Sequence, residues 1–214
     1  MRLNERRRDF NVRELITLAA TAVERRADDV TKIEKLAEGG FNRSFLLTMH
    51  DGFRLVARIP YHTTEPQSLA VSSEVATLDY LRSHDMPVPE VYGYPDNGSN
   101  PAGTPYTFLE MMSGTNLGDI WFELGEKARI EVVRGLVELE SRLFAPSFPA
   151  SGSLYYSRDL GQEKLRCELP SAQVTARGPF CIGPDTTLAM WFGKRSEIGT
   201  SREPRKMSRS VRVF

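Results

Sequence analysis

The sequence is poor in the residue types that build structural metal sites and disulfide frameworks. Its 214 residues include two cysteines, Cys167 and Cys181, and three histidines. Two cysteines are too few for a structural zinc set and are compatible with free thiols in a reducing compartment. His50, His62 and His84 are not spaced as metal ligands are. We therefore predict no metal site.

Net charge and long apolar runs are also missing. Lys and Arg number 28, as do Asp and Glu, and 40% of the residues are hydrophobic. This balance gives no reason to expect a specific nucleic-acid partner. No apolar run approaches the ~20 residues of a membrane-spanning helix, so we expect no transmembrane segment. Length and composition predict a globular chain of one domain or a little more.

The stretch Glu38–Ile59 predicts a β-hairpin that follows a glycine loop. Phe45–Met49 and Phe53–Ile59 are apolar and β-prone, and the Asp51-Gly52 step between them favours a tight turn. Gly39-Gly40 stands just before the first strand. Glycine allows a backbone to approach a bulky anion and present its N–H groups, although the same pair is also common in ordinary turns.

The second strand of this hairpin carries a cation inside an apolar run. Arg58 lies in the sequence L-V-A-R-I, and Glu74 lies on the buried face of a helix that we expect over about residues 67–83. An unpaired inward carboxylate would cost about 3–5 kcal/mol. We therefore predict an ion pair between Arg58 and Glu74, with the guanidinium also free to bind a phosphate. The apolar residues of that helical face are Ala70, Val71, Val75, Leu78 and Leu81.

These motifs, in this order, resemble a known superfamily. The matching stretches read A-E-G-G-F-N-R-S-F-L, L-V-A-R-I-P-Y, S-E-V-A-T-L-D-Y-L-R-S-H, P-V-P-E-V-Y-G-Y and G-T-N-L-G-D-I-W. They are similar to the aminoglycoside phosphotransferase and choline-kinase-like superfamily, within the protein-kinase-like fold. The resemblance covers roughly residues 6–195 and is strongest to a fungal branch that includes altered inheritance of mitochondria protein 9.

The resemblance implies an α+β, protein-kinase-like fold. We expect an N-terminal extension over 1–30, an N-lobe with an antiparallel sheet and one inward helix over 31–112, a partial, helical C-lobe with an insertion over 113–195, and a basic, disordered tail over 196–214. In the extension, Asn11 followed by Glu14 predicts a helix cap. The tail is either a segment that binds nucleic acid or anionic lipid, or the accidental end of a truncated reading frame.

The resemblance also implies an ATP site. It assigns Gly39, Gly40, Phe41 and Asn42 to the phosphate-covering loop, and Arg58 with Glu74 to the phosphate-binding ion pair. A short strand over about 106–111 would end in the hinge that meets the adenine. This assigns the Glu110 carbonyl and the Met112 N–H to the base.

The acidic groups that phosphoryl transfer requires are not found. Family members carry a loop of the form H-G-D-x-x-x-x-N and a later metal-binding aspartate. Arg158-Asp159-Leu160 imitates part of this loop, but no histidine precedes it and Lys164 replaces the asparagine. We therefore predict no catalytic residue and no Mg²⁺ ligand in this chain, and we interpret the sequence as truncated before its catalytic loop.

A long helix expected over about residues 126–144 is apolar on two sides, at Ile130, Val133 and Val137 and at Val132, Leu136, Leu139 and Leu143. Little of the chain is left to enclose it, so we expect an under-covered face that a protein partner could cover.

Two functions remain open. One is the ATP-binding lobe of a small-molecule kinase, whose acceptor the sequence does not identify. The other is a non-catalytic module that binds a nucleotide or a protein. The resemblance implies a mitochondrial location, with the cytoplasm as the alternative. The basic opening M-R-L-N-E-R-R-R contains Glu5 and lacks serine, so we do not predict a mitochondrial presequence from it.

Overall fold

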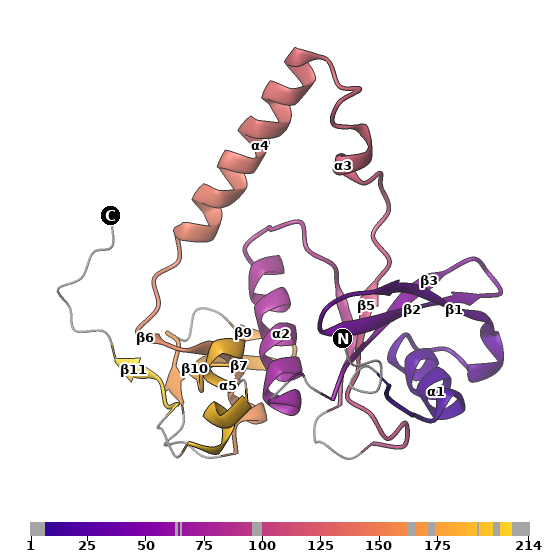
Figure 1. Ribbon diagram of the computed structural model, residues 1–214, viewed down its shortest axis with the longest axis horizontal. Coiled ribbons are helices and arrows are strands. Elements are labelled where there is room, and N and C mark those ends of the chain that lie inside the picture. The colour runs from indigo at the N-terminus through magenta and orange to yellow at the C-terminus, as the bar shows by residue number, and fades with distance from the viewer. Residues whose placement is uncertain are drawn as a thin grey trace.

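The computed structural model describes residues 7–62, 64, 66–95, 100–161, 166–170, 174–191, 193–198 and 202–206. It has an α+β fold built on a five-stranded antiparallel sheet (Figure 1), in the order β1-β2-β3-β5-β4. The strands are β1 (Val30–Glu38), β2 (Asn42–Met49), β3 (Arg54–Pro60), β4 (Val91–Gly93) and β5 (Thr107–Glu110).

The predicted hairpin is confirmed as β2 and β3. The Met49 carbonyl accepts a hydrogen bond from the Gly52 N–H at 3.0 Å, and Gly52 has a positive φ of 84° that suits glycine. Oδ1 of Asp51 accepts a hydrogen bond from the Phe53 N–H at 3.0 Å, which closes the turn. The register then runs from Thr48 opposite Arg54 to Asn42 opposite Pro60.

Helix α1 (Val12–Ala22) covers one face of this sheet and is followed by the 3₁₀ turn η2 (Ala27–Asp29). The predicted cap is present, because Oδ1 of Asn11 accepts a hydrogen bond from the Glu14 N–H at 3.2 Å. Leu15 and Ala19 of α1 are fully buried, and they share a core with Leu47 of β2 and Leu55 and Ala57 of β3.

Helix α2 (Gln67–Arg82) lies between the five-stranded sheet and a second, smaller sheet. The sequence predicted one buried face for this helix. Ser73, Ala76 and Tyr80 are buried as well, because β7 of the smaller sheet packs against α2. The second side of the helix is thus covered by residues more than 70 positions away along the chain, as in the pair Asp79 and Tyr156.

The region 113–195, which was expected to be helical, also contains β-strands. The predicted helical C-lobe over 113–195 contains a small antiparallel sheet of order β7-β10-β8, with β9 also paired to β10. Short β-prone runs such as S-L-Y-Y and F-C-I explain this difference. The elements are β6 (Ala150–Ser151), β7 (Ser153–Tyr156), η3 (Ser157–Asp159), β8 (Cys167–Glu168), β9 (Val174–Thr175), β10 (Gly178–Gly183), α5 (Leu188–Trp191), η5 (Gly193–Glu197) and β11 (Arg205–Lys206), which pairs with β6.

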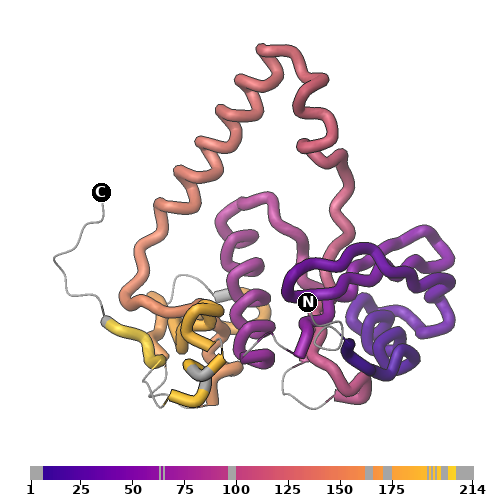
Figure 2. Tube along the Cα trace, in the orientation of Figure 1, coloured from indigo at the N-terminus to yellow at the C-terminus, as the bar shows by residue number. Residues whose placement is uncertain are grey.

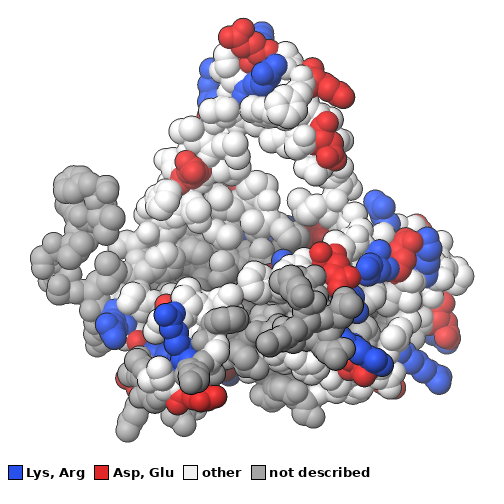
Figure 3. All heavy atoms as spheres, in the orientation of Figure 1, with Lys and Arg blue, Asp and Glu red and all other residues white. Residues whose placement is uncertain are grey.

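Helices α3 (Leu117–Ile120) and α4 (Glu126–Phe144) stand out from the rest of the chain (Figure 2). No residue of α4 is buried, and Val133, Leu136 and Val137 are each at least half exposed. Figure 3 shows an open space between α4 and the segment that leads to it. The predicted under-covered face is confirmed. None of the described helices is both long and apolar enough to cross a membrane.

Candidate functional site

The predicted ion pair between Arg58 and Glu74 is present. Nη1 of Arg58 on β3 contacts Oε1 of Glu74 on α2. The two side chains are 36% and 33% exposed, so the pair lies at the edge of the protein interior and water reaches it. Because side chains alternate along β3, Arg58 projects on the opposite face from Ala57 and Ile59, which lie in the core with α1.

Two hydroxyl side chains flank Arg58 across the sheet. Ser44 of β2 and Thr107 of β5 stand directly opposite Arg58 on its two neighbouring strands. Residues paired in this way share a face of the sheet. Thr107 is 1% exposed, whereas Ser44 is half-buried. The face that carries Arg58 therefore presents a short polar row of Ser44, Arg58 and Thr107.

The loop between β1 and β2 contains Gly39, Gly40 and Phe41. The Gly39 N–H donates a hydrogen bond to the Asn42 carbonyl at 2.9 Å. The Phe41 carbonyl accepts hydrogen bonds from the Tyr61 N–H and from Oγ1 of Thr64, both at 2.9 Å. The loop is thereby fastened to the segment that follows β3, close to Arg58 in sequence.

A charged cluster closes the base of this loop. Oε1 of Glu38 accepts hydrogen bonds from Nη2 of Arg43 at 2.9 Å and from the Tyr61 hydroxyl at 3.1 Å. Nζ of Lys35 lies 3.0 Å from Oε2. Hydrogen bonds from Arg43, Lys35 and Tyr61 lower the pKa of the Glu38 carboxyl to about 2. The two ends of the loop are therefore held together by a carboxylate that stays ionised over a wide pH range.

The residues predicted to meet the adenine lie at the other end of β3. Glu110 is opposite Leu55, whereas Asn42 beside the glycine loop is opposite Pro60. Five residue steps along a strand correspond to ~17 Å. Met112 follows β5 and is 48% exposed, and its N–H has no hydrogen bond among the described residues. The structure brings Arg58 and Glu74 into contact, but it separates the loop from Glu110 and Met112.

Asp159, which lies in the R-D-L sequence that resembles part of a catalytic loop, is enclosed by neighbouring residues. Its side chain is 4% exposed and accepts hydrogen bonds from the Tyr94 hydroxyl at 3.0 and 3.3 Å. Burial raises the pKa of the Tyr94 hydroxyl to about 12, so it remains a donor to Asp159. Asp159 fastens η3 to the segment after β4. Lys164 lies outside the described residues.

The described residues include no cluster of three or more His, Cys, Asp or Glu side chains that could bind a metal ion.

Sequence reasoning missed Ser44, Thr107 and Tyr61. Ser44 could have been found from the turn, because Ser44 and Arg58 each lie seven residues from Asp51 at its centre. Thr107 required the pairing of β3 with β5, which no local signal fixes. Tyr61 was not singled out, because its contacts with Phe41 and Glu38 appear only in the folded chain.

No family model matches the chain. A subtelomeric hrmA-associated cluster protein of Aspergillus fumigatus is 36% identical over 177 residues, which are 82% of this chain and 33% of that protein. Altered inheritance of mitochondria protein 9, mitochondrial, of Candida tropicalis is 34% identical over 177 residues, covering 77% of this chain and 28% of that protein. The protein of the same name from Yarrowia lipolytica is 28% identical over 190 residues, covering 82% and 32%.

These relatives support the fungal branch that the sequence motifs indicated. Several of them are named as mitochondrial proteins, in agreement with the location that the resemblance implied. The chain spans about a third of the length of the curated relatives it matches.

Proposed function

We propose that this chain is the nucleotide-binding lobe of a protein-kinase-like phosphotransferase of the aminoglycoside phosphotransferase and choline-kinase-like superfamily. The observation that carries the proposal is the ion pair between Arg58 and Glu74. A carboxylate that pairs with a strand cation fixes the guanidinium fork, which leaves further donors for a phosphate. The order of the motifs along the chain, from the glycine loop to the segment after β5, supports it.

The glycine loop has room for a ligand. A Cβ at Gly40 would meet nothing within 4 Å, and one at Gly39 would meet only the Asn42 carbonyl oxygen at 3.7 Å. Neither glycine has a positive φ. Since neither backbone strain nor packing among the described residues requires glycine here, close approach of a ligand is a reason for these residues. Phe41, which is 52% exposed at the loop tip, would cover the ligand.

An elongated nucleotide fits this arrangement along β3. Its phosphates would lie by residues 39–42 and Arg58, and its base would lie by the Glu110 carbonyl and the Met112 N–H, ~17 Å away along the strand. ATP would supply the phosphoryl group. Because the chain spans about a third of its relatives, the part proposed for these residues is to hold and orient the nucleotide.

Isothermal titration calorimetry of ATP, with and without Mg²⁺, tests the proposal on the purified chain. Arg58→Ala should weaken ATP binding at least ten-fold, because it removes the cation held by Glu74. Glu74→Gln should weaken binding less, since the guanidinium remains but loses its fixed position. Arg54→Ala is the matched control, since Arg54 lies on the same strand and is exposed. ATP binding by Arg58→Ala that equals that of the parent would overturn the proposal, as would a parent chain that does not bind ATP.

A second candidate is a non-catalytic module that binds a protein partner. The exposed apolar residues of α4 favour it, because such a surface is unfavourable in water. The burial of Asp159 also favours it, because a hydrogen-bonded and enclosed carboxylate is not placed to accept a proton from a substrate. This candidate predicts no transfer of a labelled γ-phosphate by the chain. Mg²⁺-dependent transfer that disappears in Asp159→Ala would contradict it.

The proposed location is the mitochondrion, by similarity to the relatives whose names include that word. Import of a fluorescent fusion of the chain, compared with the cytosolic distribution of the free fluorophore, tests this assignment.

A further inference from the structure

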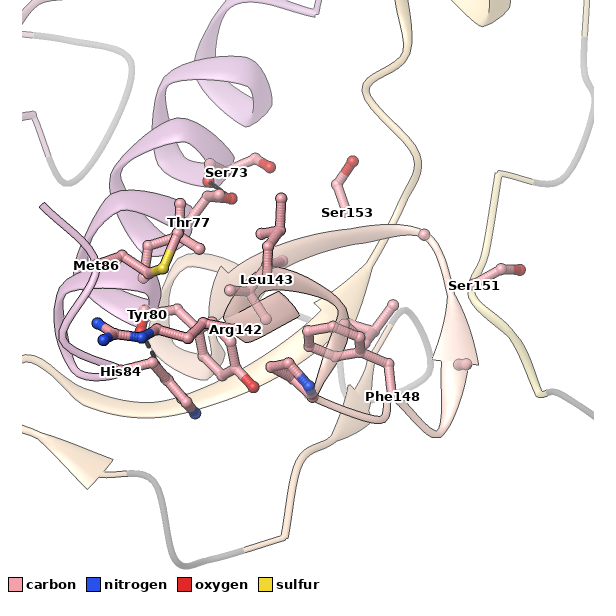
Figure 4. Close-up of a pocket in the computed structure, with 16 residues that line it drawn as sticks. Ser73, Thr77, Tyr80, His84, Met86, Arg142, Leu143, Phe148, Ser151 and Ser153 are labelled. Atoms are coloured by element: carbon pink, nitrogen blue, oxygen red, sulfur yellow. Dashed lines mark hydrogen bonds between the residues drawn. The ribbon is translucent and has the colours of Figure 1, made fainter. Parts of the chain in front are cut away.

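A cavity of about 400 Å³ lies between α2, the C-terminal end of α4 and the segment from β6 to β7 (Figure 4). Arg58 and the glycine loop do not line it. Its walls are largely apolar and include Leu143, Phe148, Leu154 and Ile182. Volumes of 300–1,000 Å³ with apolar walls and a few convergent polar groups are typical of small-molecule sites, ~70–90% of whose ligand surface becomes buried.

Two hydroxyl groups of largely buried residues line the cavity. Ser73 is 7% exposed and Tyr80 is 4% exposed. The hydroxyl of neither residue makes a hydrogen bond within the described part of the chain. Neither hydroxyl oxygen is among the buried unpaired atoms of the described residues, so both are accessible from the cavity. The two groups are therefore available to a ligand that carries oxygen atoms.

Among the described residues that line the cavity, Arg142 is the charged one and none carries a carboxylate; His84 lines it as well. Figure 4 shows Arg142 extending from α4 toward Tyr80 and His84. The guanidinium of Arg142 makes no ion pair or hydrogen bond with a described side chain. A cation without a partner at the mouth of an apolar cavity favours an anionic group there, because a carboxylate can accept both donors of its fork.

We propose that this cavity binds a small amphiphile with an apolar body and a carboxylate head group, a medium-chain fatty acid being the simplest example. The body packs between Phe148, Leu154 and Ile182, and the head group accepts hydrogen bonds from Arg142 and from the Tyr80 hydroxyl. A second cavity of about 590 Å³ adjoins the first and shares Tyr80, His84 and Arg142. It is also lined by Asp85. The shared Arg142 and Tyr80 place the carboxylate at the junction, and like charge at Asp85 keeps the ligand in the first cavity.

This site is independent of the proposed nucleotide site, since it shares no residue with the glycine loop or with Arg58. An alcohol with the same apolar body would lack the charge that pairs with Arg142. An amine would place like charge beside Arg142. An alcohol and an amine of the same chain length are therefore the control ligands.

Calorimetric titration of the purified chain with decanoate below its micelle concentration tests the proposal. We expect saturable binding of one decanoate, at least ten-fold weaker binding of decylammonium, and weaker binding of decanol. Arg142→Gln should weaken decanoate binding at least ten-fold. Tyr80→Phe should weaken it about three- to ten-fold, with decanol binding less affected. Arg142 is exposed, so its replacement tests the site even if a change at the buried Tyr80 perturbs folding.

Two control variants on α4 separate the cavity from the exposed helix surface. Arg134 pairs with Glu131 in the middle of the helix, and Val133 is 50% exposed. Arg134→Gln and Val133→Ser should bind decanoate as the parent does. Three results would overturn the proposal: no saturable decanoate binding by the parent, undiminished binding by Arg142→Gln, or a loss in Val133→Ser equal to that in Arg142→Gln. The last would place the ligand on the exposed apolar face of α4.

Discussion

Arg177 donates a hydrogen bond from Nη1 to Oδ2 of Asp79 at 2.6 Å, joining residues 98 positions apart. The Asp79 side chain is 10% exposed and also accepts a hydrogen bond from the Tyr156 hydroxyl at 2.7 Å. Nη2 of Arg177 donates to the Val91 carbonyl at 2.5 Å. These contacts fasten α2, the helix that carries Glu74, to the smaller sheet and to β4.

Arg177→Ala should destabilise the chain by about 2–4 kcal/mol, because it leaves the largely enclosed Asp79 carboxylate with one donor fewer and frees the Val91 carbonyl. The urea-unfolding midpoint measures the change. Arg134→Ala, which breaks an exposed pair with Glu131, should change stability by less than about 1 kcal/mol. Equal effects of the two substitutions would show that the Asp79 contact does not stabilise α2.

The stability contribution of Glu38 should depend on pH. Its pKa in the folded chain is about 2, below its ordinary value of 4.5. The contribution is therefore complete above about pH 4.5 and is lost as the pH falls toward about 2. Glu38→Gln should be less stable than the parent at pH 6, and the difference should shrink over that window. Urea unfolding at pH 6, 4 and 3 measures it, and a difference that stays constant with pH would contradict the assignment.

Replacing glycine by alanine should lower the stability of the chain at Gly152 and raise it at Gly135. A Cβ at Gly152, which has φ of 147°, would lie 2.3 Å from the Gly183 carbonyl oxygen. Gly152→Ala should therefore destabilise the chain by roughly 2–4 kcal/mol. Gly135 lies within α4, and its Cβ would meet nothing within 4 Å. Gly135→Ala should stabilise by ~1 kcal/mol, because alanine favours a helix. Thermal unfolding of both variants checks the two signs.

The exposed apolar face of α4 should cause self-association of the isolated chain. Ile130, Val133 and Val137 are each about half exposed or more. The double variant Val133→Glu, Val137→Lys should remain monomeric at concentrations where the parent associates, as measured by sedimentation velocity. Its unfolding midpoint should change little, because neither side chain is buried. A parent that is monodisperse and unfolds cooperatively would contradict this prediction.

Local chemistry explains why much of the candidate site could be predicted. The Asp51-Gly52 step fixes a turn, and the turn fixes the register that places Ser44 opposite Arg58. Helical periodicity placed Glu74 on the face of α2 that meets Arg58. The bounds of α4 were also predicted, because its apolar residues recur at helical spacing from Ile130 to Leu143. Each of these features depends on residues close together in sequence.

The amino-acid sequence by itself determined the hairpin, the capped first helix, the pairing of Arg58 with Glu74 and the exposed apolar face of α4, because turn preference, capping and side-chain period act over a few residues. Only the tertiary structure decided that β7 and β10 cover the second side of α2, that Asp159 is enclosed by Tyr94, and that a cavity forms beside Tyr80 and Arg142. These features join segments more than 60 residues apart. Such contacts depend on which surfaces of the helices and strands remain uncovered after these elements have formed. A local sequence pattern does not predict which surfaces will meet.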